Sequence, residues 1–414
     1  MKAFKYRERI PPGHLLGPEA RLLMLAAGAS DDDATRAILR EPINWKDLCI
    51  LAHHEKASSV LVRQLNRLGV EIGDYQYLEL RQLATDSVMQ MLQLEQLLNQ
   101  ILDFLASEKI DAVLLKGAGL AYTVYASFPD RPMGDIDVLV RPEHAQRAWS
   151  LLQKKGWTPL STDEQSTRHA GHHHLPPLFH DGATFRLEIH DALLPGEHPF
   201  RFSTAEIWRR ARQITVNGRT ILVPALMHQL WHTCVHFAWS HAMQWGSWRA
   251  VRDTAAIIRR GEVDWTQFVS FARESRAATC CFWTLRLTRR LTGAAVPDYV
   301  LTSLQPPYPD FIIDRLERHF VSSLFPSEDR CPSVLLTRRL WEAGVSPRWS
   351  GHGAARPWQV SERWIAASGL PKAKESASRA VTRWVRRMGA SVTYLLRLTG
   401  FALPITVVTA QTST

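Results

Sequence analysis

The sequence feature that most constrains the fold lies between Asp111 and Val140, where two short apolar runs are separated by turn-forming residues. The run from Ala112 to Leu115 has the length of a buried strand, and the small-residue stretch Lys116-Gly117-Ala118-Gly119 follows it directly. An apolar run that ends at glycine is typical of a buried strand leading into a turn. Because backbone N–H groups in such a turn can approach an anion, we expect a phosphate to bind there.

A second predicted strand, Asp135-Ile136-Asp137-Val138-Leu139-Val140, contains two carboxylates. We expect a helix from Leu120 to about Ala126 and then a loop before this strand. Side chains alternate between the faces of a strand, so Asp135 and Asp137 should project on the same side. Like charges at this spacing repel and raise one another's pKa, and a hard divalent cation with oxygen ligands is the usual compensation. The pair therefore predicts a metal site.

A third predicted strand, Phe185-Arg186-Leu187-Glu188-Ile189-His190, alternates polar and apolar residues. The alternation puts Arg186, Glu188 and His190 on one face and the apolar side chains on the other. Glu188 is therefore a candidate to join the two aspartates.

The ordered set of Gly-containing turn, Asp-x-Asp strand and later acid resembles the nucleotidyltransferase superfamily typified by polymerase beta. The Lys-Gly turn and the segment from Arg131 to Asp137, Arg-Pro-Met-Gly-Asp-Ile-Asp, also resemble a bacterial family of uncharacterised nucleotidyltransferases. The Glu188-x-His190 pattern and the preceding His174-Leu-Pro-Pro segment are similar to that family as well. One departure is Gly117-Ala118, which stands where the superfamily commonly has Gly-Ser and so lacks a hydroxyl for a phosphate.

The resemblance implies a Mg²⁺-dependent enzyme that binds a nucleoside triphosphate such as ATP. The catalytic metal ligands would be Asp135, Asp137 and Glu188, with Glu188 either completing the metal site or acting as a base. The nucleotide and phosphate contacts would be Lys116, Gly117, Gly119, Arg131, His174 and His190. Arg131 would contribute a fork of donors and Lys116 a point charge.

The acceptor of the nucleotidyl group is not identified by the sequence, and it could be a small molecule, a peptide or a protein. One alternative keeps the fold but transfers the terminal phosphate instead of the nucleotide. A second alternative is a catalytically degenerate nucleotide-binding module, because the Gly-Ser pair is missing. The resemblance favours nucleotidyl transfer, and so does the lack of a Gly-x-x-x-x-Gly-Lys-Ser/Thr loop and of a His-Arg-Asp kinase loop, so this is the preferred hypothesis.

Histidines are dense before the third predicted strand, at His169, His172, His173, His174 and His180. Such density can mark a zinc site, but we favour a polar loop over the cleft with one or two histidines meeting phosphate or substrate. A second series, His228, His232 and His236, has helical spacing. A zinc protease needs Glu directly after the first His of such a pair, so Gln229 and Thr233 exclude that reading.

The predicted fold class is α+β, a small mixed-sheet nucleotidyltransferase core flanked by N-terminal and C-terminal helical regions. We expect an N-terminal helical region over 1–108, the α/β core over 109–223, a helical domain over 224–305 and a C-terminal region over 306–414. Within the first region, Leu48 to Leu68 and Val88 to Leu105 have the clearest helical periodicity. At 414 residues with 45% hydrophobic composition, the chain is long enough for several domains.

We expect a cytoplasmic protein without a transmembrane span, because the chain starts without a signal-peptide pattern and holds no apolar run of about 18 residues. Its five cysteines have no Cys-x-x-Cys spacing, which argues against a disulfide framework or a cysteine zinc site.

The formal net charge of +10 is concentrated near the end of the chain. Seven basic side chains and one acidic side chain lie between Lys372 and Gly400, and Val381, Trp384, Val385 and Met388 are interleaved with them. A basic amphipathic helix of this kind can contact nucleic acid or a membrane surface, although packing on the protein itself is the commoner explanation.

Overall fold

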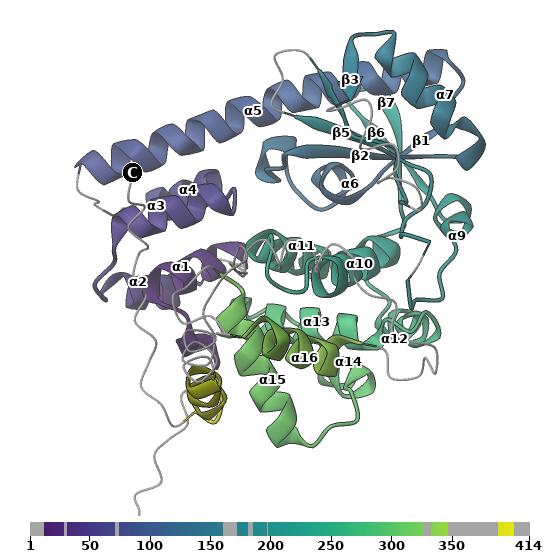
Figure 1. Ribbon diagram of the computed structural model, residues 1–414. Coiled ribbons are helices and arrows are strands. Elements are labelled where there is room, and N and C mark those ends of the chain that lie inside the picture. Colours follow the sequence, from purple (N-terminus) through teal and green to yellow (C-terminus); the bar gives the residue numbers. More distant parts are fainter. Residues whose placement is uncertain are drawn as a thin grey trace, which may run out of the picture. The chain divides into compact units, whose positions relative to one another are not determined.

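The computed structural model describes residues 12–28, 31–70, 74–159, 172–180, 185–196, 198–325, 333–346 and 388–400 (Figure 1). These residues form two compact units, each assembled from separate stretches of the chain. One unit comprises 52–233 and 256–276 and contains the sheet, and the other comprises 1–51, 234–255 and 277–414 and is helical. The four-segment division expected from the sequence stays a prediction.

The sheet of the described residues is mixed and has the strand order β3-β4-β5-β2-β1-β7-β6. The two parallel pairs are β2 with β5 and β1 with β7, and the other neighbours are antiparallel. The strands are β1 (Ala112–Leu114), β2 (Asp135–Val140), β3 (Trp157–Pro159), β4 (Leu178–His180), β5 (Arg186–His190), β6 (Arg212–Val216) and β7 (Arg219–Val223). Helices before and after this sheet complete the expected α+β fold, which is confirmed.

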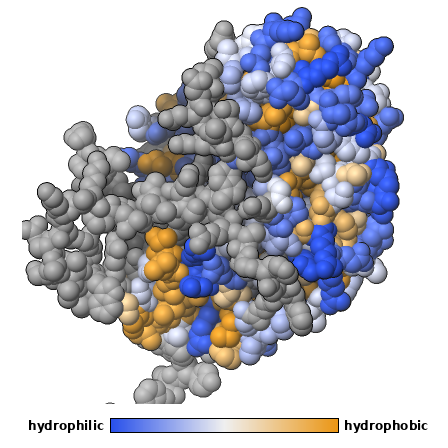
Figure 2. All heavy atoms as spheres, turned by 45° about the vertical axis from the view of Figure 1, so that its right-hand side comes forward, coloured by the Kyte–Doolittle hydropathy of each residue, from blue (hydrophilic) through white to orange (hydrophobic). Residues whose placement is uncertain are grey.

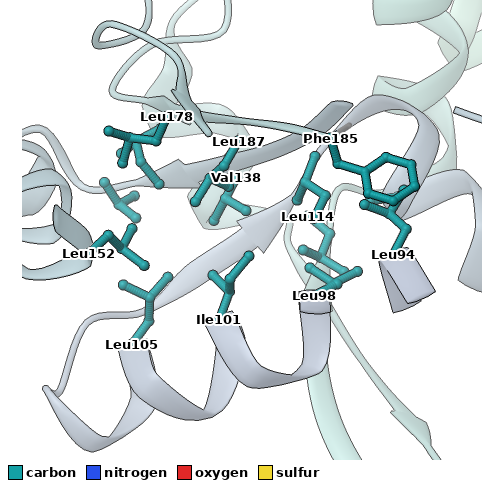
Figure 3. Close-up of a cluster of buried hydrophobic side chains, with 14 of the residues drawn as sticks. Leu94, Leu98, Ile101, Leu105, Leu114, Val138, Leu152, Leu178, Phe185 and Leu187 are labelled. Carbon is teal, nitrogen blue, oxygen red and sulfur yellow. The ribbon is translucent and has the colours of Figure 1, made fainter. Parts of the chain in front are cut away.

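The helices that lie wholly or mainly in the sheet unit are α4 (Ser58–Arg67), α5 (Asp74–Ser107), α6 (Lys116–Thr123), α7 (Pro142–Gln153), α9 (Thr204–Arg209), α10 (Leu226–Val235) and α12 (Trp265–Glu274), with the short η2 (Phe128–Asp130). The longest of them, α5, places apolar side chains three or four positions apart along one face. Figure 3 shows Leu94, Leu98, Ile101 and Leu105 of α5 directed at side chains of the sheet, among them Leu114 and Val138. Each such fully buried side chain contributes about 1.5–3 kcal/mol to folding.

The same core fixes the position of β2 and β5, because their apolar side chains point into it while their polar side chains point away. Val138 of β2 and Leu187 of β5 are fully buried in the cluster (Figure 3). A shift of either strand by one residue would put a carboxylate into this core. The register that positions the polar face is therefore set by hydrophobic packing.

The helical unit contains α1 (Pro18–Ala27), α2 (Asp32–Leu39), α3 (Trp45–His54), α13 (Ala278–Thr292), α14 (Asp298–Leu304), α15 (Asp310–Ser323) and α16 (Val334–Val345), the short η1 (Pro12–Leu15) and η3 (His236–Ser240), and part of α11 (Ser247–Arg260). Its core buries tryptophans whose indole N–H groups each donate to a backbone carbonyl. The distances from Nε1 are 2.7 Å for Trp248 to Leu23 O, 2.9 Å for Trp283 to Gly344 O, and 2.8 Å for Trp341 to Ala238 O. These bonds remove the cost of burying a polar N–H in an apolar core.

Residues 388–397 are helical, and Tyr394 joins them to α15 through a 2.9 Å hydrogen bond between its hydroxyl and His319 Nδ1. This part of the basic segment therefore packs on the protein itself. Residues 372–387 of that segment, with most of its arginines, lie outside the described residues, as do His169 and Cys331.

Several predicted elements agree closely with the structure, and two need correction. The strand from Asp135 to Val140 has the predicted bounds, and the helical periodicity from Val88 to Leu105 lies within α5. The stretch from Leu48 to Leu68 is helical as predicted, but it forms two helices, because Lys56 with a φ of 59° separates α3 from α4. The helix predicted from Leu120 begins instead at Lys116, so the Lys116–Gly119 stretch is the first turn of α6.

The surface mixes polar and apolar side chains. Among the coloured residues on the face shown in Figure 2, hydrophilic residues in blue predominate, with smaller hydrophobic areas in orange between them. Within the described residues, no helix is both long and apolar enough to cross a membrane.

Gly119 provides a test of how α6 is seated on β1. A Cβ added to Gly119 would lie 2.5 Å from the carbonyl oxygen of Leu114, which is backbone and cannot move aside cheaply. We expect Gly119→Ala to lower the free energy of unfolding by about 1–3 kcal/mol. Urea denaturation measures this change.

The matched control is Gly196→Ala, because an added Cβ meets no atom within 4 Å there. Equal stability of the Gly119→Ala variant and the wild-type protein would contradict the close packing of α6 on β1.

Candidate functional site

The polar faces of β2 and β5 form one cluster because the two strands are parallel neighbours in a fixed register. Asp135 is opposite Arg186, Asp137 is opposite Glu188, and Leu139 is opposite His190. Side chains of paired residues project on the same face of a sheet. The structure therefore brings together the three acids that the sequence pointed to.

Asp137 is at the centre of this cluster and is almost fully buried, with 2% of its surface exposed. Its Oδ1 accepts from Lys116 Nζ at 2.6 Å and from His190 Nε2 at 2.8 Å. One carboxylate oxygen is thus bound by groups from α6 and from β5. A buried carboxylate needs such partners, since an unpaired buried charge is very costly.

Glu188 is also buried, with 6% of its surface exposed, and it is surrounded by basic groups. Its Oε1 lies 3.1 Å from Arg186 Nε, and its Oε2 lies 3.6 Å from His190 Nε2 and 3.9 Å from Lys116 Nζ. His174 Nε2 is 4.0 Å from the same Oε2. Glu188 therefore faces the same cluster as Asp137.

Asp135 lies at the more open end of the cluster. Its side chain is 38% exposed, and its Oδ2 accepts from Arg186 Nη2 at 2.9 Å. Arg186 thus bridges Asp135 and Glu188. Since Asp135 is the most accessible of the three carboxylates, an incoming cation or substrate would meet it first.

The basic groups decide the ionisation of the buried acids. Burial raises the pKa of the Asp137 carboxyl, but Lys116 and His190 outweigh this effect and hold that pKa well below its usual range. For Glu188, burial also raises the pKa, and the hydrogen bond from His190 with the charge of Lys116 leaves it lowered. The pKa expected to be raised in the aspartate pair is instead lowered for Asp137, because internal cations outweigh the other effects. The charge of Asp137 does raise the pKa of Glu188, but the basic groups around Glu188 outweigh that contribution as well.

The carboxylates in turn favour the charged forms of Lys116 and His190. Burial lowers the pKa of Lys116, but the surrounding carboxylates, Asp137 first, raise it above its ordinary value. Burial and Lys116 lower the pKa of His190, whereas its hydrogen bonds with Asp137 and Glu188 leave it raised. The carboxylates and the basic groups of the cluster thus each favour the charged form of the other.

The first turn of α6 is next to this network. Lys116 has a φ of 44°, and the N-cap residue Leu115 makes no side-chain capping bond, so backbone N–H groups at this end have no side-chain cap. A Cβ built on Gly117 would lie 3.4 Å from Arg131 Nη1, which places the guanidinium beside the helix start. A helix N-terminus with an adjacent arginine suits a phosphate.

Gly119 has a different place from the one that the sequence suggested. Its close approach is to the backbone of Leu114 in β1. The structure therefore gives Gly119 a packing role, while Gly117 lies beside Arg131.

Sequence reasoning did not single out two histidines that lie near the cluster. His173 is in the segment before β4, and its ring centroid is 5.1 Å from that of His190. His232 is on α10, and burial, together with the charges of Lys116 and His190, lowers its pKa to about 3. The four-residue spacing of His228, His232 and His236 indicated a shared helix face, but it could not show that His232 is the one near the cluster.

The other two histidines of that series lie elsewhere. His228 is buried against Phe271 and Phe202, at centroid distances of 5.3 and 6.1 Å. His236 belongs to the helical unit. The predicted helical periodicity was correct, but residues spaced four apart along this stretch have different surroundings.

Asp137, Glu188 and His190 could hold a metal ion, since one ligand atom from each lies within 4.8 Å of the others. The two carboxylates suit Mg²⁺, which prefers oxygen ligands, and half-exposed Asp135 can add a third carboxylate. The donor set therefore fits a divalent cation. Lys116 Nζ now occupies the position beside Asp137 Oδ1, so a cation bound there would have to displace it.

A family model described as uncharacterised nucleotidyltransferase matches residues 41–293, which is more than half of the chain. No curated protein matches the sequence. The matched range includes every candidate site residue named from the sequence.

Lys116 should make a large contribution to stability through its contact with buried Asp137. We expect Lys116→Met to lower the free energy of unfolding by about 3 kcal/mol, because a buried carboxylate would lose a charged partner. The double variant Lys116→Met/Asp137→Leu should recover part of this loss, since the buried charge is then gone as well.

The control is Lys154→Met at an exposed position. Chemical denaturation at pH 7 measures the free energy of unfolding of the wild-type protein and of the three variants. If Lys116→Met changes stability by less than about 0.5 kcal/mol, as an ordinary surface substitution does, the internal ion pair does not hold in solution.

Proposed function

We propose that this chain, which belongs to the family of uncharacterised nucleotidyltransferases, transfers a nucleotidyl group from a nucleoside triphosphate to an acceptor in a Mg²⁺-dependent reaction. The observation that carries the proposal is the in-register pairing of β2 and β5, which gathers Asp135, Asp137 and Glu188 on one face beside the start of α6. Because nucleoside triphosphates are the substrate, we also propose that the reaction takes place in the cytoplasm.

Asp135 and Asp137 are the proposed metal ligands. Asp137 is buried in the cluster, and Asp135 lies at its open end. When bound, Mg²⁺ would neutralise charge on the triphosphate and on the attacking and leaving oxygens. Glu188 would complete the ligand set or accept a proton from the acceptor hydroxyl, and His190 would keep Asp137 oriented through their 2.8 Å hydrogen bond.

The triphosphate is proposed to lie against the first turn of α6. Backbone N–H groups of that turn would receive phosphate oxygens, and Arg131 beside Gly117 would add a charged fork. Lys116, once displaced from Asp137, would be free to pair with a phosphate instead. Lys116 would therefore hold the empty site together and neutralise phosphate charge in the occupied one.

This arrangement favours attack at the α-phosphorus. With the outer phosphates held at the helix start and the α-phosphorus next to the carboxylates, pyrophosphate is the leaving group. A phosphotransferase would need the nucleotide reversed, with the γ-phosphorus beside the carboxylates.

A degenerate nucleotide-binding module is the second candidate, and one observation favours it. Asp137 and Glu188 already have internal cationic partners, so the site is electrostatically balanced without a metal. If these partners cannot be displaced, the protein would bind a nucleotide without turning it over.

The metal ligands can be tested by calorimetric titration with Mg-ATP and Mg-CTP. Asp135→Asn and Asp137→Asn should each weaken Mg²⁺-dependent nucleotide binding at least about tenfold, because each removes a charged oxygen ligand. The control is Asp111→Asn, an exposed aspartate that precedes β1. Unchanged affinity in both site variants would rule out the carboxylate metal site.

The direction of transfer can be tested by incubating the protein with α-labelled or γ-labelled ATP and a cell extract as acceptor source. We expect label from the α position to appear on the acceptor, with release of pyrophosphate, and none from the γ position. Transfer from the γ position alone would make the protein a phosphotransferase. Nucleotide binding without transfer of either label would support the degenerate module.

A further inference from the structure

Three consecutive histidines lie beside the carboxylate cluster and form a group of their own. One ring nitrogen from each of His172, His173 and His174 lies within 4.8 Å of the others. The ring centroids of His174 are 5.4 Å from those of His172 and 5.0 Å from those of His173. All three side chains are half-buried, so the group remains accessible to a small ion.

The backbone of this segment is fixed on β5. His174 forms a bridge with His190, and Leu175 N donates to Ile189 O at 2.9 Å. The carbonyl of His173 accepts from Asp191 N at 3.2 Å and from Ala192 N at 3.3 Å. These bonds hold the main chain from His173 to Leu175 on β5, so the backbone that carries two of the three rings is already ordered.

The ring nitrogens are in a suitable state to bind a metal. His174 Nδ1 donates to the carbonyl of Leu175 at 2.9 Å, which leaves the lone pair on Nε2 for a metal. His173 Nδ1 is buried and has no hydrogen-bond partner among the described residues. A buried polar nitrogen without a partner is costly, and a bound ion would remove this cost.

We propose that His172, His173 and His174 form a transition-metal site that binds Zn²⁺. This site is separate from the carboxylate cluster. Three imidazole nitrogens suit Zn²⁺ and related ions such as Co²⁺, whereas Mg²⁺ requires oxygen ligands. Three protein ligands leave a fourth position for water or a substrate group.

The site needs only small side-chain movements. In a tetrahedral zinc site with bonds of about 2.0–2.1 Å, ligand nitrogens are about 3.3 Å apart. Since the nitrogens lie within 4.8 Å of one another, no pair has to approach by more than about 1.5 Å. The ion would add positive charge beside Glu188, whose Oε2 is 4.0 Å from His174 Nε2.

The test uses the full chain without a polyhistidine tag and titrates it with Co²⁺, whose visible absorption reports nitrogen ligands and tetrahedral geometry. We expect one equivalent to bind in the presence of excess Mg²⁺. His173→Gln and His174→Gln should each weaken Co²⁺ binding by at least about tenfold, with circular dichroism confirming that they fold. If either variant fails to fold, His172→Gln provides the same comparison.

Two controls separate this site from others. His180→Gln, in the neighbouring β4, should leave Co²⁺ affinity unchanged. Asp137→Asn should also leave it unchanged, which distinguishes the histidine site from the proposed Mg²⁺ site. The proposal is overturned if the wild-type chain binds no Co²⁺, if the His180 variant loses as much affinity as the His173 variant, or if Asp137→Asn abolishes binding while His173→Gln retains it.

Discussion

The parallel pairing of β2 with β5 is the constraint on which the site depends. It sets Asp137 opposite Glu188, and it follows from the burial of Val138 and Leu187 on the other face of the same strands. Because strand register has a period of two, the hydrophobic core and the polar cluster are two results of one alignment. The core packed against α5 therefore fixes where the polar cluster lies.

The polar cluster is held by its own charges. Asp137 and Glu188 are buried, and Lys116, Arg186 and His190 compensate them at distances of 2.6–3.9 Å. Such a network stabilises the empty site, but it also makes a divalent cation compete with an internal ammonium. The affinity for metal and nucleotide would then depend on how easily Lys116 changes partners, and the phosphates themselves offer the alternative partner.

The sequence was informative where local pattern determines structure. The alternation in β2 and β5 predicted which side chains share a face, and the resemblance carried by the Lys-Gly turn and the Asp-Ile-Asp strand agreed with the family match. It could not show that Lys116 would pair with Asp137, because that contact joins residues 21 positions apart through the start of α6. The pKa of Asp137 was misjudged for the same reason, since the compensating cations come from other elements.

The break between α3 and α4 at Lys56 and the location of His232 depended on tertiary packing, which periodicity does not encode. The dense histidines before β5 suggested either a zinc site or a polar loop over the cleft. The distances among His172, His173 and His174 now give the zinc-site hypothesis a geometric basis. In each case the missing information was which elements lie side by side.

The central claim is that the carboxylate cluster accepts a divalent metal by releasing Lys116. A crystal structure with Mn²⁺ and a non-hydrolysable nucleoside triphosphate analogue tests it most directly, because Mn²⁺ scatters anomalously. We predict an anomalous peak bound by Asp135 and Asp137, with Lys116 Nζ moved from Asp137 to a phosphate oxygen. A nucleotide bound with no anomalous peak at these aspartates, and with Lys116 still on Asp137, would contradict the account.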